Sequence, residues 1–215
     1  MSAILLSPQQ MASRNRAGAM AQATARAFRM GPQIHPNRAA YDFYPTPPEA
    51  TEALLRAEKF EGTIWEPACG QGHISKVLRN AGYDVYSTDL VHHGFGVAGK
   101  DFLKYERSCA KNIITNPPYG RGLADAFAKH AFSLTDKTGG KVAMLMNLAG
   151  LCHPLRHDFY VSRPPRAIYA LDECRCWPNG IPQSLDTSIA KQRYSWIVWD
   201  HAYQGPTRFD WLSTR

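Results

Sequence analysis

The residues best suited to chemistry begin with Asn116-Pro117-Pro118-Tyr119, which follows the run Lys-Asn-Ile-Ile-Thr at 111–115. That run predicts a buried strand. Two prolines fix the backbone after the strand and remove two amide donors. The Asn116 side-chain oxygen and the Pro117 carbonyl oxygen can then accept both hydrogens of an exocyclic amine, which favours a pyramidal nitrogen with its lone pair directed at an electrophile. Tyr119 could stack on a flipped base, a contact worth about 1–3 kcal/mol.

The turn from Glu66 to Gly72 is the second segment, and it reads Glu-Pro-Ala-Cys-Gly-Gln-Gly. Gly70 and Gly72 let the backbone approach a ligand where a Cβ atom would collide. Asp89 ends the next expected strand, where a carboxylate can accept hydrogen bonds from both hydroxyls of a ribose. A dinucleotide fingerprint would need glycine in place of Ser75. The leading acid suits a cationic nucleoside such as S-adenosylmethionine, and a tight turn without a ligand is the alternative.

Asp101 and Phe102 form a third candidate element, after a presumed third strand. The acid could hydrogen-bond to the cofactor's adenine, and the aromatic ring could pack against it. A simple loop start is the alternative interpretation of this pair.

Three segments together carry a resemblance to a known family. Asn-Pro-Pro-Tyr at 116–119 resembles motif IV of the amino-methyltransferases, and the loop at 66–72 resembles their motif I. Tyr-Asp-Phe-Tyr-Pro-Thr-Pro at 41–47 is similar to motif X. The order X, I, IV is that of the gamma group of DNA N6-adenine methyltransferases, which includes phage-encoded orphan enzymes. Asp101-Phe102 falls where the family's motif III would lie.

The resemblance implies transfer of a methyl group from S-adenosylmethionine to N6 of adenine in DNA, after base flipping. It implies a catalytic motif made of Asn116, Pro117, Pro118 and Tyr119. It also implies a cofactor pocket lined by Tyr44, Thr46, Glu66, Ala68, Gly70, Gly72, Asp89, Asp101, Phe102 and Asn116.

Other substrates with the same chemistry stay open. Adenine in RNA is one, and N4 of cytosine in DNA is another, although that group more often carries serine at the first motif position. A protein glutamine amide is a third, because release-factor methyltransferases also use Asn-Pro-Pro-Tyr. A catalytically dead nucleic-acid-binding module would be expected to have degraded motifs, whereas these are intact.

Strands that alternate with helices must position these motifs. A capping box at Thr46, Pro47 and Glu49 predicts a helix start, and Gly82 predicts a helix stop. The alternation favours a mainly parallel sheet covered on both faces. The resemblance makes this the Rossmann-like class I S-adenosylmethionine-dependent methyltransferase fold, α/β with a seven-stranded sheet. Strands are expected at 63–65, 83–88, 111–115, 141–146, 167–171 and 194–199, and helices after 46 and at 75–80 and 124–134.

Charge and composition indicate the organisation of the chain. Residues 1–40 contain five arginines and no acid, which predicts a basic arm, flexible when free and with helical propensity at 12–30. Residues 41–215 form the methyltransferase domain, with only a small insertion at 173–192 in place of a recognition domain. The net charge of +7 favours a polyanionic partner, and a solubilising charge is the alternative.

Several basic residues are candidate phosphate contacts that would position DNA without reading its bases. Exposed, solubilising side chains are the alternative interpretation. The candidates are Arg121, Arg156, Arg163, Arg166, Lys191 and Arg193.

The composition also excludes several classes of protein. No apolar run reaches the roughly 18–20 residues of a membrane span, and no signal peptide is evident. Five cysteines without disulfide spacing favour a reducing interior, the cytoplasm of a bacterial or phage-infected cell. No metal site is expected, because His153 and His157 lack a third ligand and Cys174-x-Cys176 lacks a partner pair.

Overall fold

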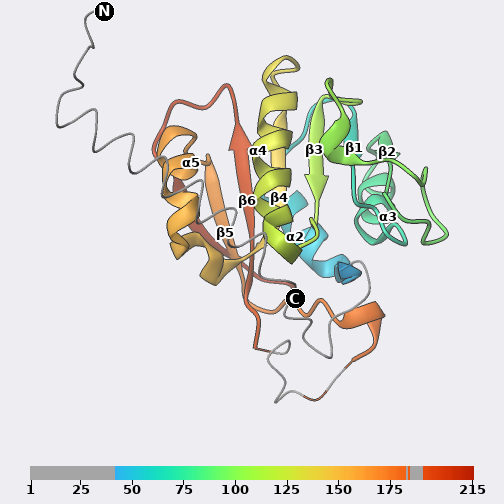
Figure 1. The fold of residues 1–215 in the computed structure, drawn as a ribbon. Helices are drawn as coiled ribbons and strands as arrows, with labels where there is room; N and C mark the ends of the chain where they lie inside the picture. Colours follow the sequence, from blue (N-terminus) through green and yellow to red (C-terminus); the bar gives the residue numbers. More distant parts are fainter. Residues whose placement is uncertain (1–41, 183, 185–190) are drawn as a thin grey trace, which may run out of the picture. The chain divides into compact units, whose positions relative to one another are not determined.

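The computed structural model describes residues 42–182, 184 and 191–215. Within them the chain forms a seven-stranded sheet with the order β2-β1-β3-β4-β6-β5-β7. Only the pairs that β6 makes with β4 and β5 are antiparallel, so β6 runs against the other strands (Figure 1). The strands are β1 (Ile64–Glu66), β2 (Val85–Ser87), β3 (Asn112–Thr115), β4 (Lys141–Asn147), β5 (Ala167–Leu171), β6 (Tyr194–Asp200) and β7 (Arg208–Leu212).

Helices cover both faces of the sheet, because side chains alternate along each strand. In β4, Ala143 and Leu145 belong to the core under α2 and α3, whereas Val142, Met144 and Met146 belong to the core under α4. In Figure 1, α4 crosses the near face of the sheet. The helices are α2 (Pro48–Ala57), α3 (His73–Asn80), α4 (Leu123–Asp136) and α5 (His157–Ser162), with short 3-10 turns η2 (Phe102–Lys104), η3 (Gly120–Gly122), η4 (Leu148–Cys152), η5 (Pro154–Arg156) and η6 (Pro178–Gly180).

The predicted α/β fold with a mainly parallel seven-stranded sheet is confirmed. The expected arm at 1–40, its helix at 12–30 and part of the insertion at 173–192 lie outside the described residues. In the described part of the chain, no helix combines the length and apolar character needed to cross a membrane.

The strand expected before Asp101 is not formed. Only an isolated bridge joins Thr88 to Val97 in that region. Gly94, Gly96 and Gly99 all adopt positive φ values there, and these bend the chain out of an extended conformation.

The predicted capping box is also wrong. Helix α2 begins at Pro48, Pro47 occupies its N-cap position, and no side chain caps it. The Thr46 hydroxyl accepts a hydrogen bond from Asn116 Nδ2 instead. The stop signal is correct, because α3 ends at Asn80 and the Gly82 amide, at φ +89°, donates to the Arg79 carbonyl.

Candidate active site

The expected functional residues lie at the carboxyl ends of three neighbouring parallel strands. We refer to this side of the sheet as its carboxyl end. Glu66 is the last residue of β1, Asp89 follows β2, and Asn116 follows β3. Since β2, β1 and β3 are adjacent and parallel, these residues share the carboxyl end of the sheet, where open α/β sheets bind ligands.

The side-chain amide of Asn116 is fixed by the segment that precedes α2. Nδ2 donates to the Tyr44 carbonyl oxygen at 3.0 Å and to Thr46 Oγ1 at 3.1 Å. Cys176 Sγ lies 4.0 Å from the same nitrogen. The Gly120 amide donates to Asp42 Oδ2 at 2.7 Å, which ties the two segments together a second time. The structure therefore brings the motif X-like and motif IV-like segments into contact.

Tyr119 directs its hydroxyl inward. The oxygen lies 2.6 Å from Asn116 Oδ1 and 2.8 Å from the Leu145 carbonyl oxygen, so its proton is donated to one or the other. Burial raises the pKa of Tyr119 well above its usual value, and the group therefore stays a donor. The ring is half-buried and packs against both cores. The structure gives Tyr119 a role in holding Asn116, and its stacking on a base stays a prediction.

The two glycines of the loop adopt left-handed backbone conformations, and their contact with a ligand stays a prediction. Gly70 and Gly72 adopt φ values of +52° and +79°. The close neighbours, however, are aromatic rings: a Cβ atom on Gly70 would lie 2.7 Å from Phe43, and one on Gly72 would lie 2.5 Å from Phe95. In this conformation the glycines are thus needed for the approach of these rings.

Asp89 is held beside this loop by main-chain donors. Oδ2 accepts from the Gly70 amide at 2.8 Å, and Oδ1 accepts from the Val91 amide at 2.9 Å. Each carboxylate oxygen has a further lone pair that can accept a hydroxyl hydrogen. The carboxylate is therefore pre-oriented while retaining the capacity to bind a diol.

Glu66 faces inward, toward the first turn of α3. Its side chain is 2% exposed, and Oε2 accepts from the Ser75 amide at 2.8 Å and from the Ser75 hydroxyl. Desolvation raises its pKa to about 8, the hydrogen bonds from Ser75 oppose this shift, and the charge of Asp89 adds to it. Its nearest partners are thus in α3, and a contact with a cationic ligand stays a prediction.

Neighbours of Glu66 in the loop have a packing role. Ala68 is half-buried against the α4-side core. Desolvation raises the pKa of the buried Cys69 thiol to about 12, so it is neutral and unsuited to nucleophilic attack.

Asp101 and Phe102 contribute to local structure. Asp101 Oδ1 accepts from the Leu103 amide at 3.1 Å and caps η2. Phe102 is 2% exposed and fills the α4-side core, with ring centroids 5.1 Å from Trp65 and 4.7 Å from Phe127. Contact of either residue with an adenine stays a prediction.

The candidate phosphate contacts divide between the amino end and the carboxyl end of the sheet. Arg166 immediately precedes β5 and forms ion pairs with Glu58 at 2.9 Å and Asp200 at 3.6 Å. The carbonyl of Arg163 accepts a hydrogen bond from Trp199 Nε1, near the end of antiparallel β6. Both arginines therefore lie at the amino ends of the parallel strands, at the end of the sheet opposite Asn116, so a DNA surface around Asn116 would not include them.

The remaining basic candidates lie at the carboxyl end of the sheet, the end where Asn116 lies. Lys191 and Arg193 are exposed and precede β6, whose first residue pairs with Asn147 at the end of β4. Arg121 follows Tyr119 in η3. Arg156 also follows β4, but its Nε is paired with Asp125 Oδ1 at 2.5 Å, so it is partly committed to the fold.

The structure adds aromatic residues that sequence reasoning missed. Phe43 and His93 stack with a centroid distance of 4.5 Å and an interplanar angle of 15°. Phe95 lies over Gly72 and receives the cationic groups of Lys76 and Arg79 on its ring. Phe43 lies inside the motif X-like segment, which was a usable signal, whereas nothing in the 90–99 run distinguished His93 or Phe95.

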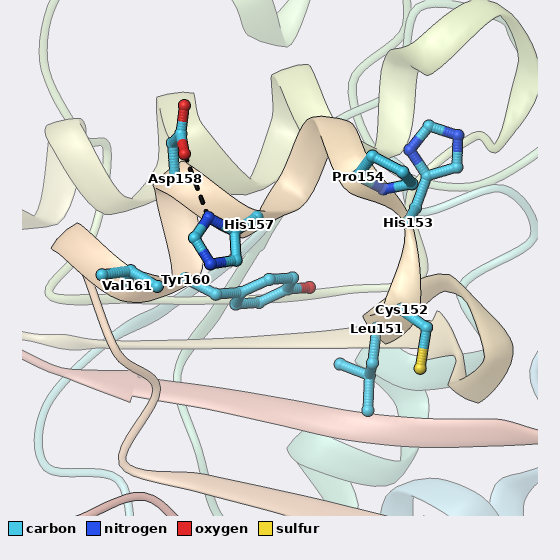
Figure 2. Close-up of a pocket in the computed structure, with 8 residues that line it drawn as sticks. All are labelled: Leu151, Cys152, His153, Pro154, His157, Asp158, Tyr160 and Val161. Carbon is cyan, nitrogen blue, oxygen red and sulfur yellow. Dashed lines mark hydrogen bonds and ion pairs between the residues drawn. The ribbon is translucent and has the colours of Figure 1, made fainter.

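A shallow depression of about 490 Å³ lies beyond the end of β4, between residues 151 and 161 (Figure 2). His157 and Asp158 form an exposed pair there at 3.1 Å. His153 lies at the other end of the depression, as Figure 2 shows. Among the residues that the structure describes, no group of three or more His, Cys, Asp or Glu side chains could hold a metal ion.

Comparison with known proteins places this fold. No family model and no curated protein matches the sequence. The M protein of the type I restriction enzyme EcoKI superposes with a TM-score of 0.51 at 12% identity, over 77% of this chain and 47% of that chain. A modification subunit of a putative type I restriction enzyme from Vibrio vulnificus YJ016 gives 0.49 at 14% identity, over 96% and 53%. A putative RNA methyltransferase from Pyrococcus horikoshii gives 0.48 at 13% identity, over 71% and 79%.

The chain spans about half the length of the two restriction-enzyme subunits. At these identities the likeness concerns the fold. The protein has the Rossmann-like fold of the class I S-adenosylmethionine-dependent methyltransferases.

Proposed function

We propose that the protein transfers a methyl group from S-adenosylmethionine to the exocyclic N6 of adenine in DNA, after the base is flipped out. The observation that carries the proposal is the position of Asn116. Its amide is fixed at the carboxyl end of β3. The glycine loop and Asp89 lie at the same end of the sheet.

The residues around the glycine loop fit the cofactor. A carboxylate fixed at the end of β2 offers its free lone pairs to two ribose hydroxyls, and no phosphate has to be accommodated beside the buried Glu66. The Phe43 and Phe95 rings supply apolar surface next to the loop. When bound, S-adenosylmethionine supplies an electrophilic methyl group.

The chain's own residues position the amine. Asn116 Oδ1 lies within hydrogen-bond distance of the Tyr119 hydroxyl, and because a carbonyl oxygen has two lone pairs it can also accept one amine hydrogen. The Pro117 carbonyl oxygen would accept the other. With both hydrogens held, the nitrogen lone pair points away from the ring plane toward the methyl group. No strong base is required beforehand, because the surplus proton becomes acidic once the new N–C bond forms.

DNA is the proposed polyanion for reasons of charge. The chain carries a net charge of +7, and Lys191 and Arg193 are exposed at the carboxyl end of the sheet, where Asn116 also lies. The name of the EcoKI M protein connects the same fold with a type I restriction enzyme, and we extend that connection to this chain as part of the proposal.

The test incubates the protein with S-adenosylmethionine labelled in its methyl group and, separately, with duplex DNA, single-stranded DNA and RNA. Mass spectrometry of the digested nucleosides then identifies the product. We expect label in N6-methyladenine from DNA. Label only in RNA, or in N4-methylcytosine, would overturn the substrate while keeping the chemistry. An absence of label from all three, with the cofactor bound, would overturn the proposal.

A further inference from the structure

Among the described residues, strand β7 leaves one edge of the sheet open. It is last in the sheet order and pairs in parallel with β5, and no other described strand lies beyond it. The Arg208 amide donates to Arg166, and the Leu212 carbonyl accepts from Asp172, so both residues direct their main-chain groups toward β5. Main-chain groups alternate in direction along a strand, so those of Phe209 and Trp211 point outward.

The side chains on one face of β7 are apolar and exposed. Phe209 is 48% exposed and Trp211 is 72% exposed, and their rings contact each other at a centroid distance of 5.1 Å. Arg208 and Asp210 are exposed on the opposite face of the same strand. An open edge strand that carries large apolar side chains is a template for pairing with another chain, and natural proteins generally cover or charge it.

We propose that the open edge of β7 pairs with β7 of a second copy of this chain, antiparallel across a two-fold axis. A two-fold axis beside a strand requires antiparallel pairing, and each copy then covers the other with the same residues. The partner is thus a second copy because this strand is complementary to itself.

Among the registers centred on residues 208, 209 and 210, charge favours one. With the axis at Phe209, this residue lies opposite the partner's Phe209, and Arg208 lies opposite the partner's Asp210 on both sides of the axis. Shifting the axis to Asp210 would set two like-charged carboxylates against each other, and shifting it to Arg208 would do so with two guanidinium groups. Opposite charges across neighbouring strands stabilise pairing, and like charges destabilise it.

One contact within the single chain is consistent with this register. The Trp211 amide, which points outward, donates to its neighbour Asp210 Oδ1 at 2.8 Å. Pairing would transfer this amide to the main-chain carbonyl of the partner's Thr207. The Asp210 carboxylate would then be released to bind the partner's Arg208.

Sedimentation velocity of the full chain over a series of micromolar concentrations tests the proposal. The wild-type chain is expected to shift from monomer to dimer as the concentration rises. Asp210→Arg sets arginines against each other and should weaken dimerisation by about tenfold or more, as should Arg208→Asp with two acids. The double variant Arg208→Asp/Asp210→Arg rebuilds both ion pairs with exchanged partners and should restore the dimer.

Leu155→Ser is the matched control, because Leu155 is 59% exposed on η5. It should leave dimerisation unchanged. A wild-type chain that stays monomeric would overturn the proposal, and so would a dimer that neither single variant weakens. Failure of the double variant to recover, with thermal unfolding that matches the wild type, would overturn the register and with it the argument for a second copy. None of these outcomes depends on methyl transfer.

Discussion

Asn116 donates a hydrogen bond from Nδ2 to the hydroxyl oxygen of Thr46, at 3.1 Å and across 70 positions of the chain. A primary amide has a donor end and an acceptor end, so fixing Nδ2 also fixes the direction of Oδ1. The acceptor proposed to hold the substrate amine is therefore oriented by the residues that precede α2.

Thr46→Val tests this relationship, since it removes the acceptor while keeping the side-chain shape. We expect kcat to fall by about threefold to tenfold, the effect of one lost hydrogen bond of about 0.5–1.5 kcal/mol. Thr46→Ser keeps the hydroxyl and should retain most of the activity. Steady-state kinetics of the three proteins decide the matter, and equal losses in both variants would contradict the positioning role.

Glu66 should make stability depend on pH. Its native pKa of about 8 exceeds the ordinary 4.5, so the folded chain keeps a proton that the unfolded chain loses. The free energy of unfolding should therefore fall as pH rises between these values, by at most about 1.4 kcal/mol per pH unit from this group.

Glu66→Gln removes that titration and can still accept the Ser75 amide hydrogen. We expect the variant to gain stability relative to wild type as pH rises from about 5 to about 8. Urea denaturation at both pH values measures the difference. An identical pH dependence in the two proteins would refute the inferred shift.

Gly72→Ala should destabilise the fold more than Gly82→Ala. Both glycines adopt left-handed conformations, with φ +79° and +89°, which cost an alanine about 1–2 kcal/mol. Only at Gly72 would the new Cβ atom also overlap a ring, that of Phe95 at 2.5 Å, whereas Gly82 has no neighbour within 4 Å. Chemical denaturation gives both free energies of unfolding.

A second substitution separates steric overlap from backbone strain at this site. Phe95→Ala should offset part of the cost of Gly72→Ala, which gives a favourable coupling in a double-mutant cycle. Strictly additive costs would show that Phe95 does not contact this loop.

The basic residues at the carboxyl end and at the amino end of the sheet should differ in their effect on DNA binding. Lys191→Ala and Arg193→Ala should each weaken binding and reduce the slope of log affinity against log salt by about 0.9. Arg163→Ala, at the amino end of the sheet, is the control and should change neither quantity. Fluorescence anisotropy over a salt series measures both. An equal effect of Arg163→Ala would contradict DNA binding at the carboxyl end.

Much of the fold was predictable because burial leaves a pattern in the sequence. Residues 142–146 of β4 and 196–199 of β6 are continuous apolar runs, which is typical of strands covered on both faces. Strand β7 was missed because charged and aromatic residues alternate in it, and four of its five side chains are exposed. The pattern of a buried strand is absent there.

The site was less predictable, because its contacts join distant segments. Thr46 has the residue type of a helix cap, and only the fold reveals that Asn116 occupies its hydroxyl. Likewise, the sequence does not distinguish Arg166, paired with the buried Glu58, from the exposed Arg193. Residue type and spacing located the site at the carboxyl end of the parallel strands, but long-range packing determined which side chains are held in buried ion pairs.

The most direct test of the proposed function is the rate of methyl transfer by Asn116→Ala, with cofactor affinity measured by calorimetry on the same protein. Loss of a group that stabilises the transition state typically costs about 10²–10³ in rate. We predict a loss of at least that size from Asn116→Ala, with S-adenosylmethionine affinity largely retained, and no change from Asn80→Ala, an exposed residue at the end of α3. Wild-type turnover by Asn116→Ala would contradict the account.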